Sequence, residues 1–118
     1  MAFRSLNATS ACPINTSGRW IYFIQECNSG PIKIGYAFDV AQMLTKNQVG
    51  NPRPLRLIAA FFVKEADTVF GKERPEETIR IERQLHQYLA ESRVRGEWFK
   101  PTAAVVHAVR DALTRMRA

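Results

Sequence analysis

The chain has 118 residues, of which 46% are hydrophobic and 24% charged, so it is long enough for one folded domain and too apolar for a disordered chain. Its 17 basic and 11 acidic residues give a net charge of +6, which favours polyanionic partners such as nucleic acid. Two cysteines without C-x-x-C spacing exclude a disulfide framework, and no leader-like or membrane-spanning run is present, so we expect a cytoplasmic, non-membrane protein.

The first half of the chain predicts a hairpin after an irregular start. Residues 1–18 are rich in Ser, Thr and Asn and lack periodicity, so we expect a tail there, with residues 19–118 forming the single domain. The aromatic and β-branched run 19–27 predicts a strand, residues 28–31 a turn, and residues 32–36 a second strand. A turn this short indicates that the two strands pair antiparallel.

A helix and a third strand follow the hairpin. Asp39 is of a type that caps helix N-termini and Gly50 is suited to a helix end, so residues 40–49 predict a helix. The apolar run 54–63 predicts a strand inside the sheet, and the charged segment 64–75 predicts a connection. The helix therefore joins the second and third strands.

Two more helices are predicted in the second half. Pro75 suits a first helical position and acidic residues follow it, so a long helix should run from there to about Arg93. Residues 95–101 interrupt the helical pattern with a Trp-Phe pair, which we expect to fill the core. Thr102 can cap a last helix over residues 103–117. The order β-β-α-β-α-α, with a short extended segment before the last helix, indicates an α+β fold.

The long helix carries a carboxylate on its apolar side. At about 100° per residue, Glu82 falls beside Leu89 rather than among the polar residues. A carboxylate there loses hydration, which destabilises the fold unless a cation, a metal ion or hydrogen-bond donors compensate. His86 lies one turn later, near the same boundary. The spacing leaves two interpretations open: a buried ion pair beside an ordinary boundary histidine, or a metal site.

The hairpin carries the second candidate group. Tyr22 and Lys33 can be neighbours across the two strands if the register permits. An ammonium beside a phenol favours the ionised phenol, which is one way to make a general base that activates water. The alternative is an ordinary strand tyrosine and a lysine on a solvent-exposed face.

Five segments, taken in order, resemble the GIY-YIG endonuclease superfamily. They are IYFIQ (21–25), KIGYA (33–37), NPRPLRLI (51–58), IERQLHQYL (81–89) and RGEWF (95–99). The resemblance is to a phage and bacterial branch, whose second motif reads K-I-G and whose third reads E-x-x-L-H with a following G-E-W-F. It implies a three-stranded antiparallel sheet flanked by helices. It also implies hydrolysis of a DNA phosphodiester with one divalent ion, Mg²⁺ or Mn²⁺.

The resemblance assigns roles to residues of this chain. Tyr22 matches the tyrosine proposed to activate the attacking water, and Glu82 matches the metal-binding glutamate. Lys33 stands where classical members have a second tyrosine, and Gly35 would let the backbone turn tightly beside the site. The resulting catalytic set is Tyr22, Lys33, Tyr36, Glu82 and His86, with Glu82 as the metal ligand.

One position departs from the pattern. The first helix of this branch carries an Arg-Leu pair, whose arginine steadies the scissile phosphate, and Met43 stands in its place. Methionine neither donates a hydrogen bond nor offsets negative charge. Loss of arginines with this role in phosphoryl transfer reduces rates by about 10³ to 10⁵. Candidate replacements are Lys46, Arg53 and Arg56. The candidate DNA contacts are these three residues together with Arg93 and Arg95.

Two functional hypotheses follow. The first is a metal-dependent DNA endonuclease of phage or mobile-element type. The second is a catalytically inactive relative that binds nucleic acid or inhibits a host protein, and Met43 favours it. A structural domain of a larger assembly is a third interpretation.

Overall fold

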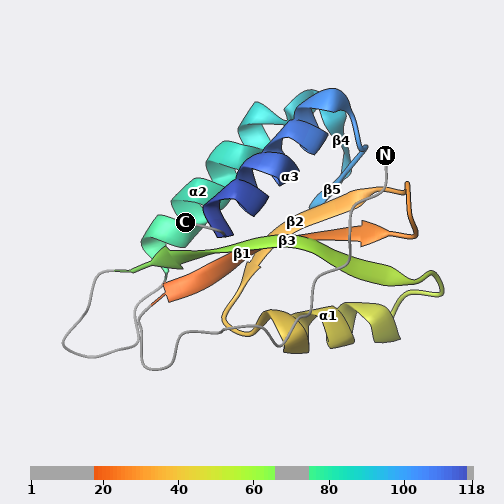
Figure 1. Cartoon of the computed structure of the whole chain (residues 1–118), viewed down its shortest axis with the longest axis horizontal. Coiled ribbons are helices and arrows are strands. Elements are labelled where there is room, and N and C mark those ends of the chain that lie inside the picture. Colours follow the sequence, from red (N-terminus) through yellow and green to blue (C-terminus); the bar gives the residue numbers. More distant parts are fainter. Residues whose placement is uncertain (1–17, 66–74, 117–118) are drawn as a thin grey trace.

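The computed structural model describes residues 18–65 and 75–116, which form one antiparallel sheet with helices on both faces (Figure 1). The strands lie in the order β3-β1-β2-β5-β4. Their bounds are Gly18–Glu26 for β1, Ile32–Ala37 for β2, Leu55–Lys64 for β3, Arg93–Arg95 for β4 and Trp98–Phe99 for β5. Residues 1–17 of the expected tail and residues 66–74 of the expected connection lie outside the described residues.

The α+β class and the element order are confirmed, but three strands is too few. The extended segment expected before the last helix forms the short hairpin of β4 and β5, which adds to the free edge of β2. This hairpin brings a distant part of the chain to the edge of the main sheet.

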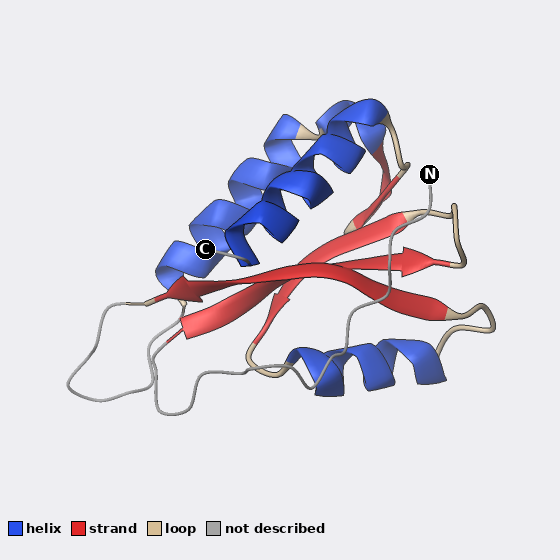
Figure 2. Cartoon of the chain, in the orientation of Figure 1, coloured by secondary structure: helices blue, strands red, loops and turns tan. Residues whose placement is uncertain are grey.

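The helices form two layers around the sheet (Figure 2). They are α1 (Val40–Val49), α2 (Glu76–Tyr88) and α3 (Ala103–Met116). Figure 1 shows α2 and α3 side by side on one face and α1 alone on the other. None of the helices in these described ranges is long and apolar enough to cross a bilayer.

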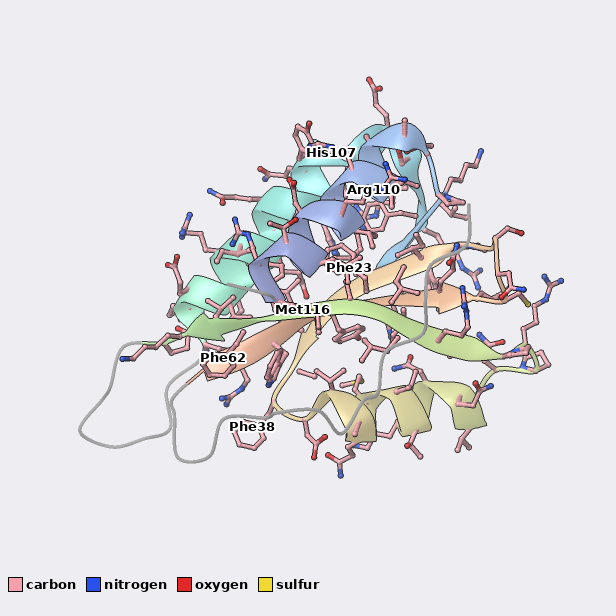
Figure 3. All side chains as sticks on the ribbon, in the orientation of Figure 1. Phe23, Phe38, Phe62, His107, Arg110 and Met116 are labelled. Atoms are coloured by element: carbon pink, nitrogen blue, oxygen red, sulfur yellow. The ribbon has the colours of Figure 1, made fainter. Side chains whose placement is uncertain are left out.

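Alternation along the strands produces a core on each face of the sheet. On the α2 and α3 face, Phe23 and Phe99 have no exposed surface, and Figure 3 places Phe23 between the sheet and α3. On the α1 face, Tyr22 belongs to a second cluster, against which Trp98 packs. The predicted core role of the Trp-Phe pair is thus confirmed, with one ring on each face.

The first helix begins and ends as predicted. Asp39 Oδ1 accepts a hydrogen bond of 3.0 Å from the backbone N–H of Gln42, and Gly50 is the C-cap of α1. Because α1 begins soon after β2 ends, Met43 and Leu44 of α1 pack against the cluster that contains Tyr22.

The second helix differs from the prediction at both ends. Pro75 lies at the N-cap, and the carboxylate of Glu65 accepts hydrogen bonds from the N–H groups of Glu77 and Thr78, at 3.0 and 2.7 Å. The helix ends at Tyr88 rather than near Arg93. The reason is that Leu89 turns into the core, and a 3₁₀ turn over Ala90–Ser92 then directs the chain into β4.

Candidate active site

The candidate site lies where the β4–β5 hairpin meets the edge of β2. β5 pairs with β2 only at Ile32 and Lys33. At the next residue, the N–H of Ile34 donates to the backbone oxygen of Glu97 over 2.9 Å. The carbonyl oxygen of Ile34 accepts from Nε2 of His86, also over 2.9 Å. Ile34 therefore ties both α2 and the β4–β5 hairpin to one point on the sheet edge.

Three side chains with metal-binding atoms meet at this point. Ligand atoms of Glu82, His86 and Glu97 all lie within 4.8 Å of one another. Glu82 Oε2 is buried and has no hydrogen-bond partner, and no salt bridge among the described residues involves Glu82. The ion pair that the sequence allows for Glu82 is therefore not formed with any residue that the structure describes, and a buried acceptor is left close to two further ligand groups.

The electrostatic state of Glu82 reflects this position. Burial and then the neighbouring Glu97 raise the pKa of its carboxyl to about 7, against the opposing effect of Arg83. Because two carboxyl groups this close repel when both are ionised, a cation between them would be strongly favoured. The donor set therefore fits a divalent ion.

Tyr22 reaches the same point from the neighbouring strand. It lies opposite Gly35 in the β1–β2 register. A Cβ atom on residue 35 would lie 2.6 Å from the Tyr22 hydroxyl oxygen and 3.2 Å from Glu97 Oε1. The phenol therefore crosses the glycine toward the sheet edge. Gly35 is inside β2, so its role as a tight turn was predicted wrongly; its role is to leave space for Tyr22.

The ionisation of Tyr22 is opposite to the sequence-based expectation. Burial, followed by the negative charges of Glu97 and Glu82, raises the pKa of Tyr22 far above its ordinary value. Lys33 lies opposite Ile24 rather than opposite Tyr22. The prediction that Lys33 lowers the pKa of Tyr22 is therefore wrong, and the phenol is protonated at neutral pH.

Lys33 is oriented by α1. Its Nζ donates a hydrogen bond of 2.7 Å to Oδ1 of Asn47 and lies 3.9 Å from Oε1 of Glu97. Asn47 is fixed in turn, because its Nδ2 donates to the carbonyl oxygen of Met43 over 2.8 Å. The side chain of Met43 packs against the cluster that contains Tyr22. A lysine ammonium is thus held beside Glu97, one of the three ligand groups.

Comparison with known families identifies the family of this chain. The family model described as T5orf172 domain matches residues 19–117. The chain belongs to the T5orf172 domain family. This domain is associated with phage and bacterial nuclease-like proteins. No curated protein and no solved structure matches the chain.

Tyr36 lies on the other side of β2 in this T5orf172 domain. It pairs with Ile21 and packs against the core cluster of the α2 and α3 face. Lys33 and Gly35 alternate with it and face α1. The structure therefore brings together Tyr22, Lys33, Glu82 and His86. Tyr36 packs on the face that α2 and α3 cover, and its catalytic role stays a prediction.

The five basic candidates occupy different environments. Arg56 donates to the carbonyl oxygen of Cys27 and to Oε1 of Gln25, at 3.1 and 3.4 Å, which holds it within the end of the sheet. The remaining four are exposed. Of these, Arg53 lies 3.4 Å from Oε1 of Glu26, and Arg93 donates to the carbonyl oxygen of Gly96. Lys46 on α1 and Arg95 on β4 are the other two.

Sequence reasoning missed two residues of the site. Glu97 was visible in the G-E-W-F segment, but only the pairing of β5 with β2 brings it to Glu82. Asn47 follows Met43 by one helical turn, which is a detectable spacing, but its contact with Lys33 depends on how α1 packs.

A groove of about 540 Å³ lies elsewhere, between α2 and α3. Residues that line it include Ile81, Leu85 and Ala112, and none of the site residues described above contributes to it. It is therefore separate from the candidate site.

Proposed function

We propose that this T5orf172 domain is a metal-dependent DNA endonuclease of GIY-YIG type, in which Glu82 holds a divalent ion. The observation that carries the proposal is the buried, unpartnered Oε2 of Glu82 beside His86 and Glu97. The motif order supports the same assignment, because Tyr22, Lys33 and Glu82 match functional positions of that superfamily and meet at one sheet edge. The family membership supports a nuclease-like role.

The donor set suits a divalent cation. Carboxylate oxygens are the ligands that Mg²⁺ and Mn²⁺ prefer, and Glu82 supplies one that lacks any other partner. When bound, such an ion supplies positive charge that stabilises a phosphate and its leaving oxygen as negative charge develops.

The residues of the chain supply the remaining functions. Lys33 presents an ammonium whose direction is set by Asn47, and in this proposal it contacts a non-bridging oxygen of the scissile phosphate. The Tyr22 hydroxyl is protonated at neutral pH and acts as a hydrogen-bonding group that orients the attacking water. Tyr22 is not assigned as the base, because burial and the two carboxylates raise its pKa.

Lys33 supplies positive charge at the site but does not replace the helix arginine, because the branch that the chain resembles carries both the K-I-G lysine and that arginine. Met43 occupies that helix position and offers no charge, whereas Lys33 lies 3.9 Å from Glu97 at the same site. Exposed Lys46 and Arg95, on the two elements that border the site, are proposed contacts for the flanking DNA backbone.

A plasmid-nicking assay tests the proposal. The wild-type protein should convert supercoiled plasmid to the nicked form only when Mg²⁺ or Mn²⁺ is present. Glu82→Gln, which keeps the shape of the side chain, should reduce the rate by about 10² or more. The exposed Glu91→Gln serves as the matched control and should retain the wild-type rate. Nicking by Glu82→Gln at the wild-type rate would reject the metal role of Glu82.

The second candidate function is DNA binding without cleavage. Met43, at the position of the superfamily arginine, is the observation that favours it. If the wild type binds but does not cut DNA, Met43→Arg should restore nicking at least about 10-fold over background in an impaired nuclease. A repurposed binder should stay inactive in both forms, and its DNA affinity should fall steeply with salt.

A further inference from the structure

We infer that Glu82, His86 and Glu97 together form a mixed oxygen and nitrogen site that binds Mn²⁺ in preference to Mg²⁺. The inference deepens the proposed function, since it concerns the ion held at the same site. It adds two ligands to Glu82 and assigns a preference among divalent ions. The ligand atoms of the three residues lie within 4.8 Å of one another, which is close enough for one ion.

His86 has the hydrogen-bonding pattern of a metal-bound histidine. A backbone carbonyl oxygen only accepts hydrogen bonds, so Nε2 of His86 must carry the proton that it shares with Ile34 over 2.9 Å. In the neutral ring, the lone pair then resides on Nδ1. Metal-bound histidines in proteins usually donate their other ring N–H to a carbonyl or carboxylate in this way. The ring is also packed edge-on against Phe99, with the ring centroids 5.1 Å apart.

Glu97 is anchored by the same residue of β2. Its backbone oxygen accepts from the N–H of Ile34 over 2.9 Å. Ile34 thus fixes His86 through its carbonyl group and Glu97 through its amide. One buried residue therefore positions two ligands, His86 and Glu97, from different segments of the chain. Little ordering of these two side chains is needed when an ion binds.

The carboxylate of Glu97 makes only a long contact with Lys33. The Lys33 ammonium lies 3.9 Å from Oε1 of Glu97, whereas its hydrogen bond of 2.7 Å is made to Asn47. Glu82 Oε2 has no hydrogen-bond partner. The two carboxylates together carry the charge that a divalent cation neutralises, and within residues 18–65 and 75–116 neither makes a short contact with a cationic side chain.

The nitrogen ligand determines the preference. Mg²⁺ binds through oxygen and retains several waters, so an imidazole adds little to its affinity. First-row transition ions gain from an imidazole ligand, and Mn²⁺ is the member of that series that also accepts carboxylates readily. A site with two carboxylates and one imidazole should therefore favour Mn²⁺ over Mg²⁺.

Pulsed electron paramagnetic resonance of bound Mn²⁺ provides the direct test, because it detects nitrogen coordinated to the ion. The chain contains two histidines, His86 and His107, so a matched control is available. His86→Gln can still donate from its amide to the Ile34 carbonyl but lacks the Nδ1 ligand. His107→Gln alters an exposed residue of α3. We expect a strong imidazole-nitrogen coupling in the wild type and in His107→Gln, and its loss in His86→Gln.

Calorimetry with Mn²⁺ and Mg²⁺ supplies a second readout. The wild type should prefer Mn²⁺ by about 10-fold or more, and both His86→Gln and Glu97→Gln should weaken Mn²⁺ binding by about 10-fold or more. A wild-type Mn²⁺ spectrum without nitrogen coupling, or equal affinity for the two ions, would overturn the inference.

The two proposals fail in different ways. Cleavage of DNA that depends on Glu82, together with equal use of the two ions and no nitrogen coupling, would leave the nuclease assignment standing and remove the mixed site. Nitrogen-coupled Mn²⁺ on a protein that binds but never cuts DNA would support the mixed site and remove the nuclease assignment.

Discussion

Replacing Glu82 with glutamine should stabilise the metal-free protein at alkaline pH. In the folded protein, burial and then Glu97 raise the pKa of Glu82 from 4.5 to about 7. The unfolded chain ionises this carboxyl near its ordinary value, so the folded state binds the proton more tightly. Stability is therefore lost as the pH rises from 4.5 through about 7, and Glu82→Gln, which cannot ionise, avoids the loss.

The magnitude follows from the size of the shift. A pKa raised from 4.5 to about 7 corresponds to at most about 3 kcal/mol of unfolding free energy. Because the side chain of Glu82 is only partly buried, solvent screening reduces the expected gain to roughly 1 to 2 kcal/mol. The ionised carboxylate of Glu82 is thus expected to destabilise the metal-free protein, although the same group is proposed to bind the metal ion.

Urea unfolding in a metal chelator measures this gain. The difference in unfolding free energy between Glu82→Gln and wild type should be near zero at about pH 4.5 and should reach roughly 1 to 2 kcal/mol at about pH 8. The exposed Glu91→Gln should change stability by less than about 0.5 kcal/mol at either pH. An equal difference at both pH values, or a destabilised Glu82→Gln at the higher pH, would refute the reasoning.

Three further predictions concern the supports of the site. Gly35→Ala places a methyl group 2.6 Å from the Tyr22 hydroxyl oxygen and should lower the unfolding free energy, measured in urea, by about 1 to 3 kcal/mol. The control Gly50→Ala, whose methyl group meets nothing within 4 Å, should leave the unfolding free energy unchanged. Asn47→Ala releases the Lys33 ammonium and should lower kcat/KM for DNA nicking by about 10-fold; an unchanged value would contradict the role. Burial raises the pKa of Glu65, but hydrogen bonds from α2 outweigh this effect and hold the pKa below its ordinary value. Glu65→Gln should therefore lower the unfolding free energy by about 1 kcal/mol at neutral pH, and this loss should shrink as the pH falls below the ordinary pKa of a glutamate. A loss that persists in acid would contradict this prediction.

Much of the fold followed from local patterns. The aromatic and β-branched runs predicted the first three strands, and Asp39 and Gly50 predicted the ends of α1. The early end of α2 was not predictable in this way, because it depends on Leu89 turning into a core that the helix does not itself form. Helical periodicity alone continues past that residue.

The candidate site was predictable only in part. Glu82 stood out because a carboxylate on an apolar helix side requires compensation, and the structure leaves it unpaired. The protonation of Tyr22 was predicted wrongly, because it depends on the burial of the phenol in the folded core and then on the approach of Glu97. Both are long-range features. Sequence spacing does not fix which strand pairs with a short hairpin that lies 65 positions later, as Lys33 and Trp98 do.

Thermal unfolding with and without Mn²⁺ measures whether Glu82 holds a divalent ion. An ion at about 100 times its Kd stabilises the folded state by about 2.7 kcal/mol, which corresponds to a rise of roughly 10 °C in Tm for a domain of this size. We expect this rise for the wild type and for Glu91→Gln above about pH 7, where Glu82 is ionised, and none for Glu82→Gln. The same rise in all three proteins, or no rise in the wild type, would contradict this role of Glu82.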